Sequence, residues 1–358
     1  MNRIWILFLA FTILPPVVAS AAANSQTPSE AGNKEDNETL RINDNRSCTV
    51  PVRRHYVARH RGIGFEILDS ESEACFVPDQ EYRLLDDLID SVLARTSYDT
   101  TIQAPEAQRQ QAAAISKTIS DVLENYHFQI FIDTETLSDA LIDRVDSNGS
   151  RVRIFDCDTG SLIFLTIAEN LHVSVAMVEI PLAGNNDHNY VRWLSNGESY
   201  FEWDLNRRSA RSTPSGLPWP YGKSMTRDEA LAYSLSLRPK LWERRGRYDD
   251  AVHDYQTALM LYGGATGYNN FSWLIATRTV AGRMQLQKAA LFAAEKAMGI
   301  YPKPNHRDTL ACAYALMGDF ERAFEEEGKA AEEQPDEVFK ARKAGFKMKP
   351  PRDCTGYK

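Results

Sequence analysis

The order of apolar and polar positions separates stretches with a helical period from stretches with a strand period. Residues 82–95 and 112–126 carry apolar side chains three and four positions apart, which predicts two amphipathic helices. A shorter helix is expected to begin at Thr134 and Glu135. Residues 159–171 are apolar almost all round, and this pattern predicts a buried helix.

Strands are predicted after the buried helix. Residues 172–180 are rich in β-branched side chains, 188–193 and 200–205 alternate between side-chain types, and Gly197 marks a hairpin turn. The alternation gives each hairpin strand a shared face: His188, Tyr190 and Arg192 in the first, Tyr200, Glu202 and Asp204 in the second. His188 is therefore expected opposite Asp204 as a cross-strand pair.

Cys157 precedes the buried helix and is expected at its N-terminus, with Asp156 or Asp158 as the cap. The backbone N–H groups and the helix dipole at such a position favour a thiolate. Cys157, His188 and Asp204 together supply what thiol catalysis needs, namely an attacking sulfur, a base for its proton and a carboxylate that orients the base.

The phrases FDCDTGSLIFLTIAE and HNYVRW resemble the transglutaminase-like (papain-related) cysteine superfamily, in particular a bacterial branch joined to tetratricopeptide repeats. The resemblance covers roughly residues 110–206 and implies an α+β domain, which we place at 81–208. It implies Cys157 as nucleophile, His188 as general base and acid, and Asp204 as the orienting residue.

The chain departs from the family pattern at one position, because many members have Gly where this chain has Phe155. Members of this branch can also lose the triad, so the fold does not guarantee turnover. Upstream, Gln129 is a candidate second oxyanion donor beside the Cys157 amide, although a structural role is the more common one for such a residue.

Composition narrows the function classes. A length of 358 residues suits two domains, and 43% hydrophobic with 25% charged residues is typical of a globular protein. A net charge of −8 does not favour binding to nucleic acid or to an anionic membrane. The sequence has no metal-ligand spacing, phosphate loop or dinucleotide fingerprint, so no metal and no cofactor are expected.

The N-terminal part is predicted to direct export. Residues 1–23 combine Arg3, an apolar run and several small-residue cleavage options, the pattern of a secretory signal. No membrane anchor is expected after its removal, and the periplasm or the exterior is the expected location. Residues 24–47 read as a disordered linker, and 48–80 as a loop-rich lead-in with a little β character at 49–52 and 65–68.

Five cysteines leave at least one thiol unpaired within a monomer, which suits a nucleophile at Cys157. The other four allow three pairings, of which Cys48–Cys75 with Cys312–Cys354 is the one we predict. Several of them being reduced and buried is the open alternative.

Residues 209–223 are rich in Pro and Gly and are predicted to be a linker. Residues 224–340 show internal similarity, with Ala recurring at offsets of 39 and 33 residues, close to the roughly 34-residue tetratricopeptide period. The packing positions of the three copies are Ala251/Tyr255/Ala258, Ala290/Ala294/Ala297 and Ala323/Glu327/Ala330. Such an array predicts a peptide or protein partner on its surface, unless it only stacks on the catalytic domain.

The basic tail 341–358 follows a capping helix expected to start near Glu337, and its charges are interpreted as a solvated face. The leading functional hypothesis is an exported cysteine hydrolase or acyltransferase that cleaves peptide or isopeptide bonds through a Cys157 acyl-thioester. The alternative is a non-catalytic binding scaffold. A third hypothesis makes the array deliver the substrate.

Overall fold

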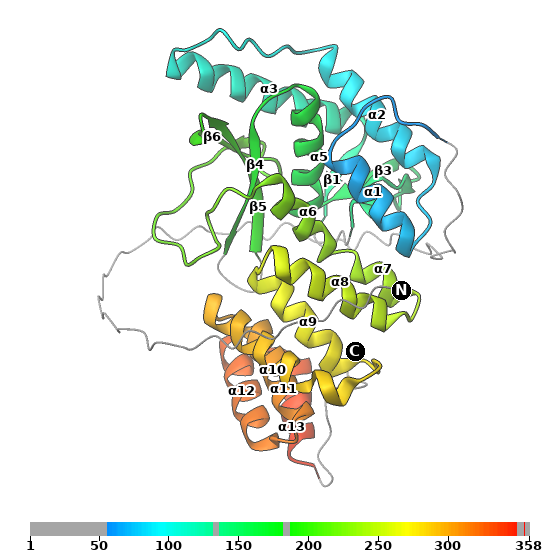
Figure 1. The fold of residues 1–358 in the computed structure, drawn as a ribbon, viewed down its shortest axis with the longest axis vertical. Helices are drawn as coiled ribbons and strands as arrows, with labels where there is room; N and C mark the ends of the chain where they lie inside the picture. Colours follow the sequence, from blue (N-terminus) through cyan, green and yellow to red (C-terminus); the bar gives the residue numbers. More distant parts are fainter. Residues whose placement is uncertain (1–55, 132–135, 182–186, 349–353, 355–358) are drawn as a thin grey trace, which may run out of the picture. The chain divides into compact units, whose positions relative to one another are not determined.

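The computed structural model describes residues 56–131, 136–181, 187–348 and 354. They form a mixed α+β structure in which a small antiparallel sheet with its helices is followed along the chain by helical segments (Figure 1). The predicted signal (1–23) and linker (24–47) lie outside the described residues.

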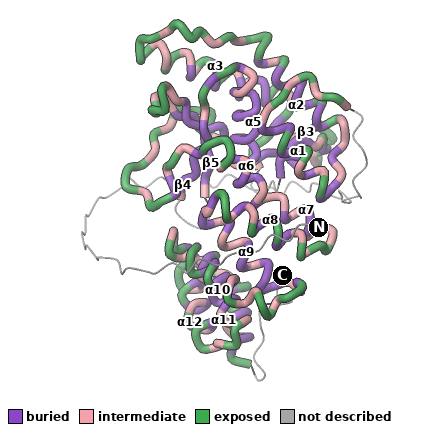
Figure 2. The backbone as a smooth tube through the Cα atoms, in the orientation of Figure 1, coloured by how far each residue is buried: buried purple, intermediate pink, exposed green. Residues whose placement is uncertain are grey.

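The helices that precede the larger sheet along the chain are α1 (Ile63–Ala74), α2 (Asp79–Leu93), α3 (Pro105–Asn125), α4 (Leu137–Leu141) and α5 (Cys157–Asn170). The apolar stripes expected at 82–95 and 112–126 are buried in α2 and α3. α5 contacts α1, α2 and α4, and it is buried from Thr159 to Ala168, as its all-apolar pattern predicts (Figure 2).

The prediction for 48–80 is wrong where the structure describes it, because 65–68 belongs to α1 and not to a strand or loop. Ile63 and Ile67 lie one turn apart and are both buried against the core. A short apolar run fits a strand and a helix equally well by periodicity, and only its packing against α5 decides between them. The predicted strand at 49–52 and the predicted start of α4 at Thr134 lie outside the described residues.

The strands form two sheets. β1 (Phe128–Ile130), β3 (Arg151–Phe155) and β2 (Arg144–Val145) form the smaller one, and β4 (Val175–Pro181), β5 (Asp187–Ser195), β6 (Glu198–Asp204) and β7 (Ser209–Ala210) form the larger antiparallel one in that order. β3 ends one residue before Asp156, so the smaller sheet delivers the chain directly to the start of α5.

The β5–β6 hairpin turns at Asn196 and Gly197, both with positive φ (51° and 82°), as the predicted Gly197 turn requires. One face of the hairpin carries Val191, Trp193 and Trp203 into the core beside α5. The opposite face carries His188, Tyr190 and Arg192. The alternation predicted from the sequence is therefore confirmed.

The segment 209–223, predicted as a linker, is attached to the larger sheet. It contributes β7, and Leu217 packs on the far face of the sheet with Val178 and Tyr190. The Gly222 backbone N–H donates to the Glu179 carbonyl at 2.8 Å. Pro and Gly in this segment form turns that follow the sheet surface, and composition alone does not distinguish such turns from a free linker.

The remaining chain forms consecutive helices. They are α6 (Arg227–Leu235), α7 (Pro239–Arg244), α8 (Tyr248–Leu261), α9 (Ala265–Thr277), α10 (Arg283–Ile300), α11 (Pro304–Leu316), α12 (Phe320–Glu333) and α13 (Glu337–Phe346). The repeated packing positions on α8, α10 and α12 are all buried. Gly246 and Gly318, equivalent in the predicted repeats, both have positive φ at the turns before α8 and α12.

The end of the chain is held by charge and by a disulfide. α13 begins at Glu337, as predicted for the capping helix. Arg342 is buried and pairs with Asp308, so this part of the tail is not a solvated face. The predicted Cys312–Cys354 disulfide is present. Cys75 is disulfide-bonded too, and its predicted partner Cys48 lies outside the described residues.

Among the helices that the structure describes, none combines the length and the apolar character that crossing a bilayer requires.

Candidate active site

Cys157 is the first residue of α5, and it is half-buried with a free thiol. The turn that carries it is fixed by Asp156, whose Oδ1 accepts the backbone N–H groups of Asp158 (3.1 Å) and Thr159 (2.9 Å). Thr159 Oγ1 accepts the Asp156 N–H in return at 3.1 Å. This capping box makes Asp156, and not Asp158, the cap of α5.

Phe155, the last residue of β3, is accommodated by Gly160. A Cβ atom at position 160 would lie only 2.6 Å from the Phe155 ring. Gly160 therefore leaves the space in which Phe155 packs, one turn away from the nucleophile candidate. A larger side chain at 160 would displace the turn that holds Cys157.

The charges near Cys157 oppose a resting thiolate. Burial first, and then the negative charges of Asp158 and Asp156, raise the pKa of the Cys157 thiol well above its usual value. The Asn189 backbone N–H donates to the sulfur and acts in the opposite direction. The direction of this shift is opposite to the thiolate expected at the helix terminus, because burial and the two carboxylates outweigh the helix dipole.

Asp158 connects Cys157 to residues that the sequence did not indicate. Cys157 Sγ donates to Asp158 Oδ1 at 3.3 Å, and the Asn189 side-chain amide donates to the same oxygen. The Asn189 amide also reaches the Tyr233 hydroxyl at 2.9 Å. Burial raises the pKa of Asp158, and burial together with the charge of Asp158 raises that of Asp156 to about 8. Both carboxyl groups beside the thiol therefore have pKa values above their usual range.

His188 is buried on β5, and its Nε2 lies 2.8 Å from Asp204 Oδ2. Asp204 Oδ2 also accepts from Arg211 at 3.0 Å, and Asp204 Oδ1 accepts the Arg207 N–H at 3.2 Å. Burial alone would raise the pKa of Asp204, but the His188 hydrogen bond, the Arg207 N–H and the Arg211 charge hold it below its usual value. Asp204 is therefore ionised at neutral pH and fixes the His188 ring.

The predicted pairing of His188 with Asp204 is present, but the two residues are not directly opposite. Val191 pairs with Trp203, whereas His188 pairs with Ile180 of β4. The side chains meet diagonally across the β5–β6 hairpin, which is within reach for a ring and a carboxylate.

The two halves of the predicted site lie on opposite faces of β5, with Cys157 beside Asn189 and with His188 beside Asp204. The Asn189 backbone N–H contacts the Cys157 sulfur, and His188 is the residue immediately before it. Nε2 of His188 is occupied by Asp204, so Nδ1 is the nitrogen left to accept a proton. No hydrogen bond joins the Cys157 thiol to the His188 ring in the described part of the chain, where the thiol donates to Asp158 instead. Neighbouring residues of a strand point to opposite faces, so the His188 ring lies on the face of β5 away from α5, and the structure does not bring it together with the thiol.

Residues outside the predicted catalytic set complete the arrangement. Arg211 comes from the predicted linker and Tyr233 from α6, and both reach the site only because those segments pack on the sheet. Of these additional residues, only Asn189 could have been suggested by the sequence, because it adjoins His188. Gln129 is exposed on β1, and no contact places it in the site. Within the described residues, no group of three or more His, Cys, Asp or Glu side chains is arranged to hold a metal ion.

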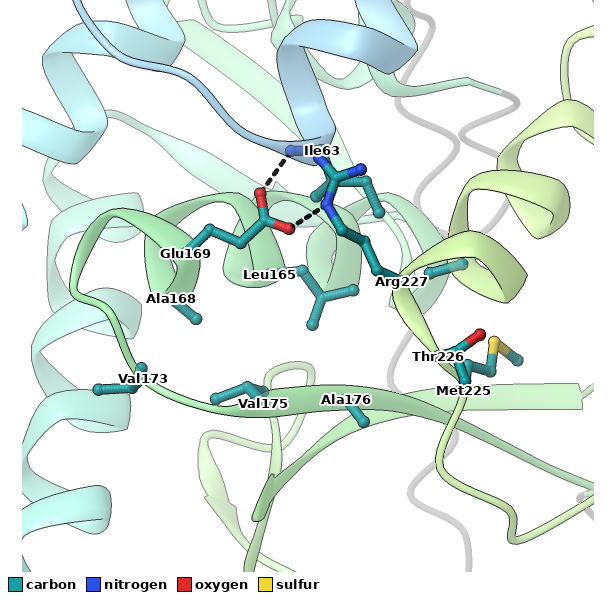
Figure 3. Close-up of a pocket in the computed structure, with 11 residues that line it drawn as sticks. Ile63, Leu165, Ala168, Glu169, Val173, Val175, Ala176, Met225, Thr226 and Arg227 are labelled. Carbon is teal, nitrogen blue, oxygen red and sulfur yellow. Dashed lines mark hydrogen bonds and ion pairs between the residues drawn. The ribbon is translucent and has the colours of Figure 1, made fainter. Parts of the chain in front are cut away.

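A pocket lies at the opposite end of α5 from Cys157 (Figure 3). Glu169 lines it, and the carboxylate accepts the Ile63 N–H and the Arg227 side chain, both at 2.7 Å. Leu165 and Val175 contribute apolar lining from α5 and β4. Because Glu169 is near the C-terminal end of α5 and Cys157 is at its start, this pocket is separate from the thiol site.

A comparison with models of known protein families and with curated proteins finds no match to this chain.

Proposed function

We propose that the chain is a cysteine-dependent hydrolase or acyltransferase that acts on peptide or isopeptide bonds through an acyl-thioester at Cys157. The observation that carries this proposal is the 2.8 Å contact between His188 Nε2 and Asp204, on the strand whose next amide touches the Cys157 sulfur. A base oriented by a carboxylate beside a free thiol is the arrangement that thiol catalysis uses.

In this proposal His188 accepts the Cys157 proton at Nδ1, and the thiolate adds to the carbonyl carbon of the amide. Asp204 keeps the ring oriented and balances its positive charge while the proton is held. When the tetrahedral intermediate collapses, the C–N bond breaks and His188 returns the proton to the leaving amine. Water then adds to the thioester with His188 as base, and the acid product and the thiol are released.

The proposal includes the identity of the two parts of the chain. The order of Cys on a buried helix, His on a strand and Asp on the next strand supports a transglutaminase-like domain. The buried Ala positions on α8, α10 and α12 support tetratricopeptide repeats that bind a peptide or protein. The signal-like residues 1–23 support export to the periplasm or exterior.

A mixture of peptides and isopeptide-linked Lys peptides, analysed by mass spectrometry after incubation, tests this function. The full chain should release new termini, and Cys157→Ala and His188→Ala should each remove that release. Cleavage that persists in Cys157→Ala would refute the acyl-thioester mechanism. Each variant must first be shown to fold like the wild type, so that lost cleavage reports the missing side chain and not an unfolded chain.

A second candidate function is a non-catalytic binding scaffold. The observation that favours it is the hydrogen bond from Cys157 to Asp158, which leaves the thiol protonated and turned away from His188. Absence of any Cys157-dependent product over the whole peptide mixture, with peptide capture on the helical segments intact, would favour this function over the first.

A further inference from the structure

Asp187 begins β5, one residue before His188, and its carboxylate is bound by side chains from three other parts of the chain. Thr266 Oγ1 donates to Oδ2 at 2.7 Å, and the Tyr221 hydroxyl donates to Oδ1 at 3.1 Å. The Lys303 ammonium also donates to Oδ1. These donors come from the first turn of α9, from the segment after β7, and from the residue that precedes α11.

The Lys303–Asp187 ion pair is almost closed to solvent, with side chains 2% and 9% exposed. Burying two opposite charges gains little net stability, because desolvation offsets most of their attraction. Removing one partner leaves the other charge buried and uncompensated. The main effect of the pair is therefore to hold Asp187 in place at the start of the strand that carries His188, and its contribution to stability is small.

Other groups that titrate face the same pair. Glu179 of β4 lies nearby, and burial and the charge of Asp187 raise its pKa to about 8. His306 of α11 is buried, and burial together with the charge of Lys303 lowers its pKa to about 4. Tyr221 and Asp158 also interact with the charge of Asp187. At neutral pH Glu179 and His306 are largely uncharged, so Lys303 is the cation left to balance Asp187.

We propose that Lys303 is a positioning residue, which holds Asp187 and through it fixes the backbone that carries His188 and the Asn189 amide in contact with Cys157. The inference rests on the proposed function. It makes the helical segments part of the active site, because without Lys303 and Thr266 the Asp187 carboxylate would keep only the Tyr221 hydroxyl of the three donors. A shift of this backbone moves the base and the amide contact to sulfur together.

The test is the rate of Cys157 alkylation by iodoacetamide against pH, measured on the full chain. Lys303→Met should slow the His188-dependent part of the rate by roughly ten- to a hundredfold, the loss expected for a displacement of about 1 Å. Arg307→Met is the matched control, because Arg307 lies on α11 but pairs with Glu326 and Glu333 of α12. That variant should react like the wild type.

The same change is then made in a His188→Ala background, where it should have no further effect, since contacts in one network are not additive. Equal slowing in both backgrounds would overturn the proposal, because Lys303 would then act on the fold alone. Thr266→Val removes one donor to Asp187 and serves if Lys303→Met does not fold. It should slow the His188-dependent rate to a smaller extent, and an unchanged rate would overturn the proposal.

The outcome also separates the two proposals. A wild-type rate that is indifferent to His188→Ala would refute the proposed function and leave Lys303 nothing to position, so both would fail. A rate that depends on His188 but not on Lys303 or Thr266 would refute the positioning role alone.

Discussion

The carboxylates on the two faces of β5 have different kinds of hydrogen-bond partner. On the face that carries His188, each carboxylate has an arginine partner: Asp204 binds Arg211, and Glu202 binds Arg192 at 2.7 Å. On the face that carries Asn189, Asp158 and Glu179 have hydroxyl and amide donors instead. On the first face the pKa of Asp204 lies below its usual value, whereas burial raises the pKa of both carboxyl groups on the second.

This difference indicates how the proposed chemistry is divided. The base and its orienting carboxylate are set in place before substrate binds. The nucleophile is not, because Cys157 gives its hydrogen bond to Asp158, and burial with the nearby carboxylates raises the pKa of its thiol. The proposed proton transfer requires a substrate to displace the thiol from Asp158 and also to bring it and the His188 ring to the same side of β5. The protein would then protect its thiol until substrate arrives, and the variants below test each half of that comparison.

The largest effect is expected from His188→Ala, which removes the proposed base bound to Asp204. Peptide cleavage should fall by about 10²- to 10⁴-fold, the usual contribution of a positioned general acid–base group. Steady-state rates on any peptide found by mass spectrometry would measure it. A loss under about tenfold would show that another group takes the thiol proton, and Asp158 is the residue in contact with it.

A stability difference between the faces comes next. Burial raises the pKa of Glu179 from 4.5 to about 8, so between these values the folded chain holds a proton that the unfolded chain has lost. Stability from this group therefore falls as pH rises through that window. Glu179→Gln removes the effect, and its stability relative to the wild type should increase by up to about 3 kcal/mol between pH values of about 5.5 and 8.

Urea unfolding at the two pH values measures this change, and Glu202→Gln is the control from the other face. Glu202 accepts from Arg192 and Thr213 at 2.7 Å, so its loss should destabilise the chain by about 1–3 kcal/mol at both pH values. If the stabilities of Glu179→Gln and Glu202→Gln relative to the wild type change equally with pH, the two faces do not differ in the protonation of their carboxyl groups.

The sequence predicted the elements of this site better than its contacts. Local periodicity was sufficient for α2, α5 and the hairpin, because each buries a face that repeats along the chain. It failed for α1, whose short apolar run becomes a helix by packing on α5. Cys157, His188 and Asp204 could be proposed because their residue types and order resemble a family.

The remaining partners could not be found in the same way. Arg211 lies in a segment whose Pro and Gly content resembles a linker, and Tyr233 and Lys303 lie on or beside helices that carry no local chemical signal. Each reaches the sheet only through long-range packing. The protonated state of the thiol was also unpredictable, because it depends on which carboxylates are buried beside it and not on the helix terminus alone.

A smaller effect is expected from Asp158→Asn on the face that carries Asn189. The change removes a nearby negative charge and keeps the size of the side chain, so the pKa of Cys157 should fall. Iodoacetamide alkylation at neutral pH should then be faster by about three- to tenfold, since the thiolate is the reactive form. Asp156→Asn keeps the helix cap and should act in the same direction but less strongly. Slower alkylation in both variants would mean that the carboxylates activate the thiol.

The smallest effect is expected from Arg211→Met, which leaves His188 bound to Asp204 and removes only the cation beside them. Arg211 contributes to the low pKa of Asp204, so that pKa should rise in the variant. As the pH is lowered, cleavage should therefore be lost at a higher pH than in the wild type, because a protonated Asp204 no longer orients a charged ring. Near neutral pH the rate should change by about two- to fivefold at most. Arg207→Met, whose side chain is 56% exposed and 3.8 Å from Asp204, should leave the acid side unchanged. A pH profile that is the same in Arg211→Met and the wild type would mean that the His188 hydrogen bond and the Arg207 backbone N–H suffice to keep Asp204 ionised. Arg211 would then serve only to pack over the Tyr190 ring.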